Sequence, residues 1–528
     1  MATVPLRSNE GRWIMVSTIL ASAMAFIDGT ALNVVLPSLQ QSLHATGADL
    51  FWILNAYLLM LAALILIGGS LGDKLGRKKV FMAGILIFMG GSAACGLSPG
   101  VTTLILFRAL QGIGGALMIP GSLSIISSSI DEKERGKAIG TWSAFTTLVT
   151  IGGPILGGAL ADAGFWRFIF FINIPLGITA LIILWQKVKE TKDTDTDRTL
   201  DFPGAVLLAA GLAALTFGML RIPATGFNNW EIYTSLGGGI LLLIAYVITE
   251  QKSKHPMLPL KLFTNRTFTG VNLLSFFLYA GLGGGMLFLS LNMVQIQGYS
   301  QMQSGLTFLP FTLLMITLAR FAGTLADKYG PRLFLILGPA TAGIGLMLLS
   351  LVSQTHGPAD YWTTFFPGIV VFGLGISFTV APLTTAVMGS VTDHLSGTAS
   401  GVNNATTRIA NVFANAVFGA LAVLLFSGAL QHHLKHTSFS PIEKQAIMQQ
   451  APDLGNAKVP ASMDAQNKAI ATTTYHTSFI EAYAIVMRLS AALAFAGALM
   501  SLIFIKNPVL KSRYSTGATA VSVAIGKG

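Results

Sequence analysis

The stretch that decides the fold of this chain is GSLGDKLGRKK, residues 69–79. Glycines at positions 68, 72 and 76 recur every four residues, and this spacing predicts a helix face that can approach a neighbouring helix closely. Asp73 and Arg77 are four residues apart, so we expect them to pair across one helical turn. A loop that is merely rich in lysine and arginine would require neither the glycine spacing nor the acid.

The composition on both sides of this stretch is that of a membrane protein. Of the 528 residues, 52% are hydrophobic and only 10% are charged, whereas a soluble domain averages about 25% charged residues. The apolar residues form blocks long enough to cross a bilayer, which takes about 20 residues each. We count fourteen such blocks, at 14–36, 50–70, 80–98, 102–124, 138–160, 167–186, 203–221, 233–249, 267–291, 304–325, 333–352, 363–384, 402–427 and 480–505. The sequence therefore predicts an all-α polytopic membrane protein.

The basic residues indicate how this protein is oriented. The formal net charge is +11, but most lysines and arginines fall in alternate connections, and the short connections between hold only Arg167 and Arg221. Because lysine and arginine resist translocation, this asymmetry predicts cytoplasmic termini in a cell membrane. The charge thus reflects topology, and we expect no nucleic-acid partner. The basic residues before the first block also resemble a signal peptide, but thirteen more blocks follow and favour a first span.

The chain divides into two related halves. GSLGDKLGRKK is echoed by GTLADKYGPRL, with Gly69 aligned to Gly323 and Asp73 to Asp327, an offset close to half the chain. Internal duplication is typical of transporters. We predict an N-terminal six-span bundle (1–186), an inner linker with two extra central spans (187–266), a C-terminal six-span bundle (267–510) with a long outer loop (429–478), and a disordered cytoplasmic tail (511–528).

Signatures of catalysis and cofactor binding are missing from the sequence. It contains neither GxxxxGK[ST] nor GxGxxG, so we expect no cofactor and no ATP-driven pump. We find no pairing of nucleophile and base and predict that the chain is not an enzyme. The stretch HHLKH at 432–436 could bind a metal, but acidic and cysteine partners are missing nearby, so a solvated loop is favoured and no metal site is predicted.

Several motifs resemble those of a known family. In its context, GSLGDKLGRKK resembles the loop motif between the second and third spans of the major facilitator superfamily. LFRALQGIGG resembles the fourth-span motif of that family, with Arg108, Gln111 and Gly112 in place. FIDGTALNVVLP, WRFIFFINIPLG and SGVNNATTRIANVFANAVFG resemble the first, sixth and thirteenth spans of its fourteen-span drug/proton antiporter subfamily. The resemblance implies a major facilitator fold, with two six-helix bundles around a cavity that opens alternately to each side.

Two motifs are candidates for gating residues by this resemblance. The inner-loop motif comprises Gly69, Gly72, Asp73, Gly76, Arg77 and Lys78. GGPILGG at 152–158 resembles the fifth-span motif of proton-coupled antiporters, with Val149 where the fuller motif has a glycine; its residues are Gly153, Pro154, Gly157 and Gly158. The family interpretation is a flexible contact that seals the cavity against leak, and the alternative is a proline-kinked structural helix.

One carboxylate lies inside an apolar run. The stretch AMAFIDGTALNVVLP, residues 23–37, contains Asp28, and burying it costs roughly 2.5–3.5 kcal/mol unless it is protonated or paired. At 1.5 Å per residue, Asp28 and Arg108 lie about 12 and about 9 Å from the outer face, which are similar depths. The resemblance implies that both helices line the same half of the cavity, so we expect the two residues to face each other. Our hypothesis is a proton-coupling pair, and the alternative is a static ion pair that locks the bundle.

A polar stripe marks the thirteenth span. Asn404, Arg408, Asn411 and Asn415 share one helix face, and we expect Arg408 about 9 Å from the inner end. A buried arginine demands water or a partner, which favours a cavity lining or gate, whereas helix–helix packing is the alternative. The substrate-cavity candidates are Asn33, Asn55, Tyr57, Gln111, Asn272, Tyr279, Asn404, Arg408 and Asn411. On the last span, Glu481 and Arg488 share a face and could pair, but exposure of Glu481 at the outer rim is favoured.

These observations favour a secondary, proton-coupled antiporter that exports lipophilic small molecules or drugs, cationic ones among them. One alternative is proton-coupled export of a specific metabolite or siderophore. A non-transporting membrane sensor is a second, but it would require a sizeable soluble domain. The expected partners are the substrate, protons and the lipid bilayer, with a periplasmic adaptor left open.

Overall fold

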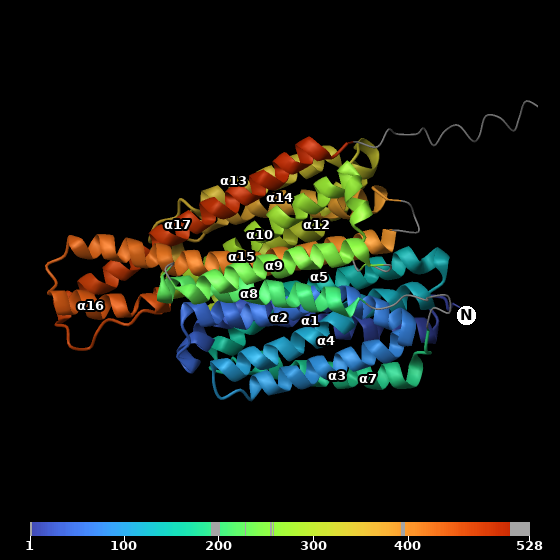
Figure 1. The fold of residues 1–528 in the computed structure, drawn as a ribbon, viewed down its shortest axis with the longest axis horizontal. Helices are drawn as coiled ribbons and strands as arrows, with labels where there is room; N and C mark the ends of the chain where they lie inside the picture. Colours follow the sequence, from blue (N-terminus) through green and yellow to red (C-terminus); the bar gives the residue numbers. More distant parts are fainter. Residues whose placement is uncertain are drawn as a thin grey trace, which may run out of the picture.

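The computed structural model describes residues 3–191, 201–226, 229–253, 256, 258–391 and 396–506. Long helices lie side by side along one direction of the molecule (Figure 1). A helix covers each of the fourteen predicted apolar blocks. The predicted tail at 511–528 and most of the linker at 187–201 lie outside the described residues, as does the side chain of Asp327.

The first six spans form one bundle, in which α2 packs against α4, α4 against α3, and α1 against α4, α5 and α7. Its helices are α1 (Asn9–Leu43), α2 (Gly47–Leu75), α3 (Arg77–Gly96), α4 (Val101–Ser129), α5 (Glu132–Asp162) and the pair α6 (Phe168–Phe171) and α7 (Asn173–Lys187). Each long apolar helix satisfies its own backbone hydrogen bonds, so the helices of the bundle contact one another mainly through their side chains.

The last six spans form a second bundle, in which α10 packs against α15 and α17, and α14 against α12 and α13. Its helices are α10 (Arg266–Gln295), α11 (Gln301–Leu306), α12 (Leu309–Tyr329), α13 (Arg332–Leu349), α14 (Phe365–Gly389), α15 (Ser396–Lys435) and α17 (Ala465–Phe504). Short 3-10 turns η1 (Leu260–Thr264) and η2 (Pro358–Asp360) lie in its connections.

The two extra helices straddle the boundary between the bundles. They are α8 (Phe202–Thr225) and α9 (Trp230–Lys252), drawn in green across the front of Figure 1. Helix α8 packs against α2 of the first bundle and α15 of the second, and α9 packs mainly against α8. The pair therefore covers one side of the α2–α15 contact.

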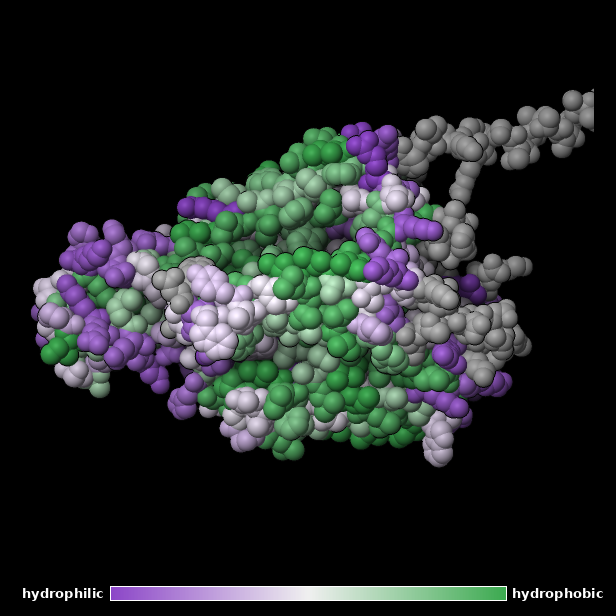
Figure 2. Space-filling view, viewed as in Figure 1, coloured by the Kyte–Doolittle hydropathy of each residue, from purple (hydrophilic) through white to green (hydrophobic). Residues whose placement is uncertain are grey.

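The surface is that of a membrane protein. Among the described residues, thirteen helices are long and apolar enough to cross a bilayer, and α5, the remaining span, contributes a shorter apolar stretch, Leu148–Asp162. Figure 2 shows hydrophobic side chains along the flanks of the long helices and hydrophilic ones gathered toward the two ends. The chain is thus a multi-pass membrane protein.

The segment predicted as a long outer loop is largely helical, so that prediction was wrong. Helices α15 and α17 extend past the other helices and carry α16 (Pro441–Gln449) and η4 (Ala451–Asn456) between them. Phe439, Ile447 and Leu454 are buried in this segment. We call residues 429–478 the lobe, and the end of the molecule that bears it the lobe end. The helices of the lobe were not predicted because the sequence of the lobe is largely polar and its few apolar residues are spread over three helices.

Close packing of α2 on α4 depends on glycine, but not on the three glycines predicted for it. A Cβ at Gly68 would overlap the backbone of Ala116 on α4, whereas Gly72 meets only Arg77. Gly76 lies beyond the end of α2, with a φ of 114° that ends the helix and lets the chain turn into α3. The prediction that all three share one packing face was therefore wrong, because the helix stops at Leu75.

Candidate functional site

The two buried charges of the first bundle lie in contact. Arg108 Nη1 on α4 is 2.5 Å from Asp28 Oδ2 on α1, and each side chain is only 1% exposed. The sequence predicted that these residues face each other, and the structure confirms the contact. A role in proton coupling stays a prediction.

The pair is part of a hydrogen-bonded network. Gln111 donates from Nε2 to Asp28 Oδ1 at 2.8 Å, and its Oε1 accepts from Arg108 Nη1 at 2.7 Å. Arg108 Nε donates to the carbonyl oxygen of Ile53 at 3.3 Å, and the guanidinium lies 4.4 Å from the ring centre of Tyr57. Desolvated charges are tolerated only when they are paired and hydrogen-bonded in this way. The pair is closed to the cavity in this conformation.

Three residues predicted to line the substrate cavity lie in this network or near it. Gln111 is fully buried in it, and Tyr57, 3% exposed, covers the guanidinium of Arg108. Asn55, on the same helix as Tyr57, is also fully buried, and neither side-chain polar atom has a hydrogen-bond partner in the structure. These three residues were predicted to line the substrate cavity, but here they lie in the closed interior.

A cavity of about 170 Å³ opens between the two bundles. Thr30 and Asn33 of α1 and Pro154 of α5 form the wall on one side, and Met286 and Ser290 of α10 form part of the other. The remaining lining is mostly apolar and includes Val34, Phe308, Leu309, Phe311 and Met315. Among the predicted cavity residues, Asn33 therefore lines a cavity between the bundles.

The polar stripe of α15 is partly exposed within the second bundle. Asn404 is exposed, Arg408 and Asn411 are half-buried, and Asn415 is 5% exposed. Two of the side-chain amides donate within their own helix. Asn404 donates to the carbonyl oxygen of Ser400, and Asn411 donates to that of Thr407. Arg408 is twelve residues after Ser396, the first described residue of α15, or about 18 Å along the helix. Its depth of about 9 Å from the inner end of the span stays a prediction.

Two candidates on α10 differ in their surroundings. Asn272 is 3% exposed, donates to the carbonyl oxygen of Phe268 and accepts from Asn403 on α15. It therefore joins two helices in this conformation, and its place in the cavity lining stays a prediction. Tyr279 is half-buried and packs against the apolar core.

The inner-loop motif forms an ordered turn. Arg77 Nη2 and Asp73 Oδ1 are 2.9 Å apart, which confirms the predicted pair. The amides of Lys78 and Lys79 both donate to the carboxylate of Glu190. Glu190 thus occupies the N-terminus of α3, where free amides and the helix dipole favour an anion. Sequence reasoning missed Glu190, because it lies 111 residues after Lys79, whose amide donates to it, and in a charged stretch assigned to a linker.

The fifth-span motif lies where the two bundles meet at the lobe end. A Cβ at Gly158 would be 2.5 Å from the carbonyl oxygen of Gln301 on α11, and one at Gly305 would be 2.6 Å from that of Pro154. Gly153 and Gly157 instead pack against α1. The glycines therefore allow α5 to touch both bundles.

Asp162 completes this contact. Its two carboxylate oxygens accept from the amides of Gln301 and Met302, each at 2.9 Å, at the N-terminus of α11. Nearby, Gln40 of α1 accepts from Gln295 of α10 and from Asn456 of η4. The bundles are thus hydrogen-bonded to each other, and to the lobe, at the lobe end. Asp162 was missed because it ends a span and gave no motif of its own.

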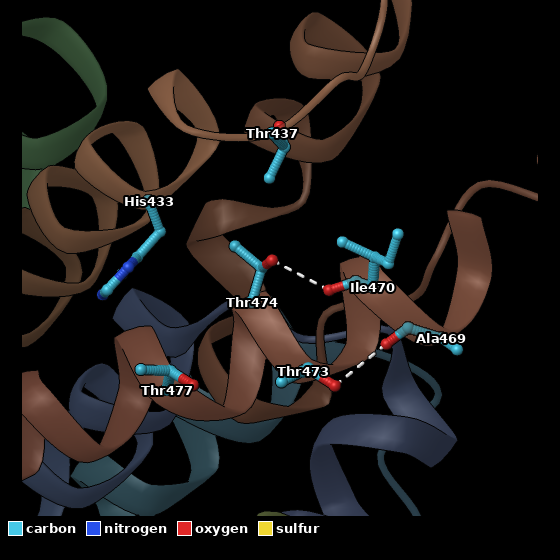
Figure 3. Close-up of a pocket in the computed structure, with 7 residues that line it drawn as sticks. All are labelled: His433, Thr437, Ala469, Ile470, Thr473, Thr474 and Thr477. Carbon is cyan, nitrogen blue, oxygen red and sulfur yellow. Dashed lines mark hydrogen bonds between the residues drawn. The ribbon is translucent and has the colours of Figure 1, made fainter. Parts of the chain in front are cut away.

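A groove of about 410 Å³ lies in the lobe, between α15 and α17 (Figure 3). Two of the threonine hydroxyls in the groove already donate hydrogen bonds within α17. Thr473 donates to the carbonyl oxygen of Ala469 and Thr474 to that of Ile470, as the dashed lines show. His433 projects beside the groove and bonds through Nε2 to Glu481 at 2.9 Å. Glu481 therefore pairs with His433 and not with Arg488. The groove is remote from the boundary between the bundles.

Comparison with known families and proteins agrees with this architecture. A sequence model described as Major Facilitator Superfamily matches residues 18–415. The tetracenomycin C resistance and export protein of Streptomyces glaucescens is 27% identical over 95% of this chain and 93% of its own length. The multidrug transporter protein MdtP of Bacillus subtilis is 31% identical over 78% of this chain and 76% of its own.

Solved structures show the same fold. A bacterial homolog of the human lysosomal transporter Spinster, in an inward-facing and unoccupied conformation, superposes with a TM-score of 0.66 at 18% identity and covers 95% of this chain and 99% of its own. The xylose transporter XylE from E. coli, in an inward open conformation, gives 0.56 at 13% identity over 94% of this chain and 97% of its own. At these identities the likeness concerns the fold alone.

Proposed function

Because the chain belongs to the major facilitator superfamily, we propose that it is a secondary exporter that expels lipophilic small molecules in exchange for protons. Its relatives carry names of multidrug or antibiotic resistance and export proteins. The observation that carries the proposal is the buried Asp28–Arg108–Gln111 network beside a mostly apolar cavity between the bundles. It combines a titratable group with a place for an apolar ligand.

The proposed orientation has both termini in the cytoplasm and the lobe outside the cell. The N-terminus lies at the end of the molecule opposite the lobe (Figure 1). The basic connections, such as the one after α2 with Lys74, Arg77, Lys78 and Lys79, lie at that same end. Lysine and arginine concentrate on the cytoplasmic side of membrane proteins, and this supports the assignment.

In this orientation the conformation is closed toward the outside. The hydrogen bonds of Asp162 to α11 and of Gln40 to Gln295 hold the bundles together at the lobe end. Export requires these contacts to open while the opposite end closes. The glycines of GGPILGG and Gly305 would permit that motion, because helices that touch backbone to backbone can slide with little loss of packing.

Asp28 is the proposed proton carrier. In the closed network it accepts hydrogen bonds from Arg108 and Gln111. A rearrangement that separates Arg108 from Asp28 would leave a desolvated carboxylate, and desolvation favours the protonated form. Outward opening would thus load a proton and the return would release it. Each inward proton supplies about 2.3 kcal/mol per 100 mV of membrane potential.

The proposal is tested with inside-out membrane vesicles that contain the full chain. An imposed pH gradient should drive accumulation of members of a panel of lipophilic drugs, and collapse of the gradient by a protonophore should release them. Vesicles from cells without the protein provide the control. Accumulation that ignores the gradient would overturn proton coupling, and no accumulation of any compound would overturn export.

Export of a single metabolite is the second candidate function. The relative from Streptomyces glaucescens is named for resistance to, and export of, one compound, and the cavity of about 170 Å³ is small. The same vesicle panel separates the two functions, because a specific exporter would accumulate one chemical class and ignore the rest.

A further inference from the structure

The charges inside the membrane-spanning part are predominantly positive. Within the fourteen apolar blocks the only acidic residues are Asp28 and Glu481, and Glu481 lies at the edge of the last block. The same blocks contain six arginines, of which Arg167 and Arg221 lie at block ends in the short connections, and Arg108, Arg320, Arg408 and Arg488 lie further inside. A cationic ligand between the bundles would therefore have a single carboxylate available to it.

That carboxylate is already occupied in this conformation. Both oxygens of Asp28 accept hydrogen bonds, Oδ1 from Gln111 and Oδ2 from Arg108, and the side chain is 1% exposed. A cation could reach Asp28 only by displacing Arg108, which would leave one buried charge without its partner. Losing one member of a buried pair is strongly unfavourable. Asp28 is thus poorly placed to recognise a cation.

Arg408 lies on the face of α15 that is directed between the two bundles. Gly419 of α15 faces Phe51 on α2, and Asn403 donates to Ser275 on α10, so these residues mark the directions of the two neighbouring helices. At 3.6 residues per turn, Arg408 falls between those two directions. The stripe therefore points toward the space that α2 and α10 enclose.

Arg408 is a charge without a counter-ion in the part of the chain that the structure describes. None of the salt bridges there includes it, whereas Arg108 pairs with Asp28. Three residues further along the same stripe, Asn411 packs against α10, where a Cβ at Gly283 would be 2.5 Å from the Oδ1 of Asn411. Arginine presents a planar fork of donors that suits carboxylate, sulfonate and phosphate groups.

The apolar cavity is close enough to serve the same ligand. Met286 in its lining is three residues after Gly283, the residue of α10 against which Asn411 of the stripe packs, and this is about 5 Å along the helix. A molecule with an apolar ring system and an acidic group could thus place its rings among Met286, Phe311 and Met315 and its acid at Arg408.

We propose that the substrates of this exporter are lipophilic organic anions, with Arg408 as the group that binds the anionic end. This inference rests on the proposed export function and names its substrate class. It departs from the expectation, drawn from sequence, that cations are among the substrates. The predominantly positive charges within the spans favour this class. The membrane potential also favours it, because a potential that is negative inside the cell drives anions outward.

The test compares two dyes that share a xanthene ring and differ in charge, the anion carboxyfluorescein and the cation rhodamine 6G. Their uptake is measured in inside-out vesicles that contain the full chain, with an imposed pH gradient. For Arg408→Gln we expect roughly a tenfold or greater loss of carboxyfluorescein transport, the size of one charged hydrogen bond. Rhodamine 6G transport should change less than about twofold.

Three further variants separate recognition from folding. Arg408→Lys keeps the charge and should retain part of the anion transport. Asn404→Asp, at an exposed site one turn before Arg408, would place a carboxylate beside it and should shift preference toward rhodamine 6G. Arg488→Gln removes an exposed arginine of α17 outside the stripe and should leave both dyes unaffected.

The inference is overturned if Arg408→Gln transports the anion as well as the wild type does. It is likewise overturned if Arg408→Gln reduces the transport of both dyes equally and Asn404→Asp leaves the preference between the two dyes unchanged. It is also overturned if the wild type moves rhodamine 6G and not carboxyfluorescein, a result that leaves the export function standing. If the wild type moves neither dye nor any drug of the panel, the export function itself fails.

Discussion

The two arginines Arg108 and Arg408 are both surrounded by apolar sequence, yet the structure treats them differently. Arg108 is 1% exposed and bonds to a carboxylate, an amide and a backbone carbonyl, with an aromatic ring over its face. Arg408 is half-buried and has no salt bridge among the described residues. One cation is part of a closed network, and the other is the proposed ligand-binding group.

In the proposed account, this difference gives the two bundles separate tasks. The first bundle holds the proposed proton-coupling carboxylate in a sealed network, and the second presents the proposed substrate-binding arginine toward the boundary between the bundles. Proton and substrate binding would then be coupled through the relative motion of the bundles.

The largest effect on stability should follow from removing the sealed arginine. Arg108→Ala leaves Asp28 and Gln111 without their partner, and breaking a buried pair costs about 3–5 kcal/mol. We expect a marked fall in the thermal midpoint of the purified protein, measured by tryptophan fluorescence. Arg408→Ala serves as the matched comparison and should cost less than about 1 kcal/mol.

A double variant checks the origin of that loss. Asp28→Asn together with Arg108→Gln removes both charges and should recover most of the midpoint, because the uncompensated charge is gone. If Arg408→Ala destabilises as much as Arg108→Ala, the contrast between the two sites is wrong.

Closure at the lobe end should be sensitive to bulk at a single glycine. Gly305→Leu would place a side chain into the carbonyl of Pro154, so the two bundles could not meet as they do here. We expect transport to fall more than tenfold while the amount of protein in the membrane is unchanged. Gly237→Leu on α9, where a Cβ meets open space, is the control and should transport normally.

The opposite end depends on a smaller interaction. Asp73 is 30% exposed and pairs with Arg77, and an exposed pair contributes about 1 kcal/mol or less to stability. We therefore expect Asp73→Asn to keep its abundance and midpoint but to transport roughly tenfold more slowly, because the pair helps to hold that end when it closes. Normal transport by this variant would reduce the motif to a topology signal.

The smallest effect concerns the lobe. Burial raises the pKa of Asp453 in η4, Lys458 lowers it, and the nearby Asp49 raises it. A raised pKa means that the folded lobe favours the protonated acid, so stability is lost as the pH rises through that pKa. Asp453→Asn should therefore raise the midpoint slightly at pH 7 and leave it unchanged at acidic pH. An equal shift at both pH values would exclude titration of Asp453.

The sequence was sufficient to predict the spans, the Asp73–Arg77 pair and the meeting of Asp28 with Arg108. These features depend on hydropathy, on spacing within a helix, and on equal depth in a membrane of fixed thickness. Each can be counted along the chain.

The sequence could not predict contacts between distant segments. Glu190 caps α3, Asp162 caps α11, and Gln40 meets η4 of the lobe, although these partners share no motif. Nor could it show which polar residues of a span face a cavity, because Asn272 and Asn33 look alike in sequence, whereas one bonds across helices and the other lines a pocket. Tertiary packing decides both.

The most direct test of the account is the transport driven by a pH gradient in Asp28→Asn. The amide preserves the size of the side chain and its hydrogen bond to Gln111, but it neither titrates nor neutralises Arg108. In inside-out vesicles we predict that accumulation against a gradient is abolished. The unpaired Arg108 should lower the thermal midpoint, but the protein stays in the membrane and still exchanges substrate without a gradient. Accumulation with the pH dependence of the wild type would contradict the account, because the proton would then travel elsewhere.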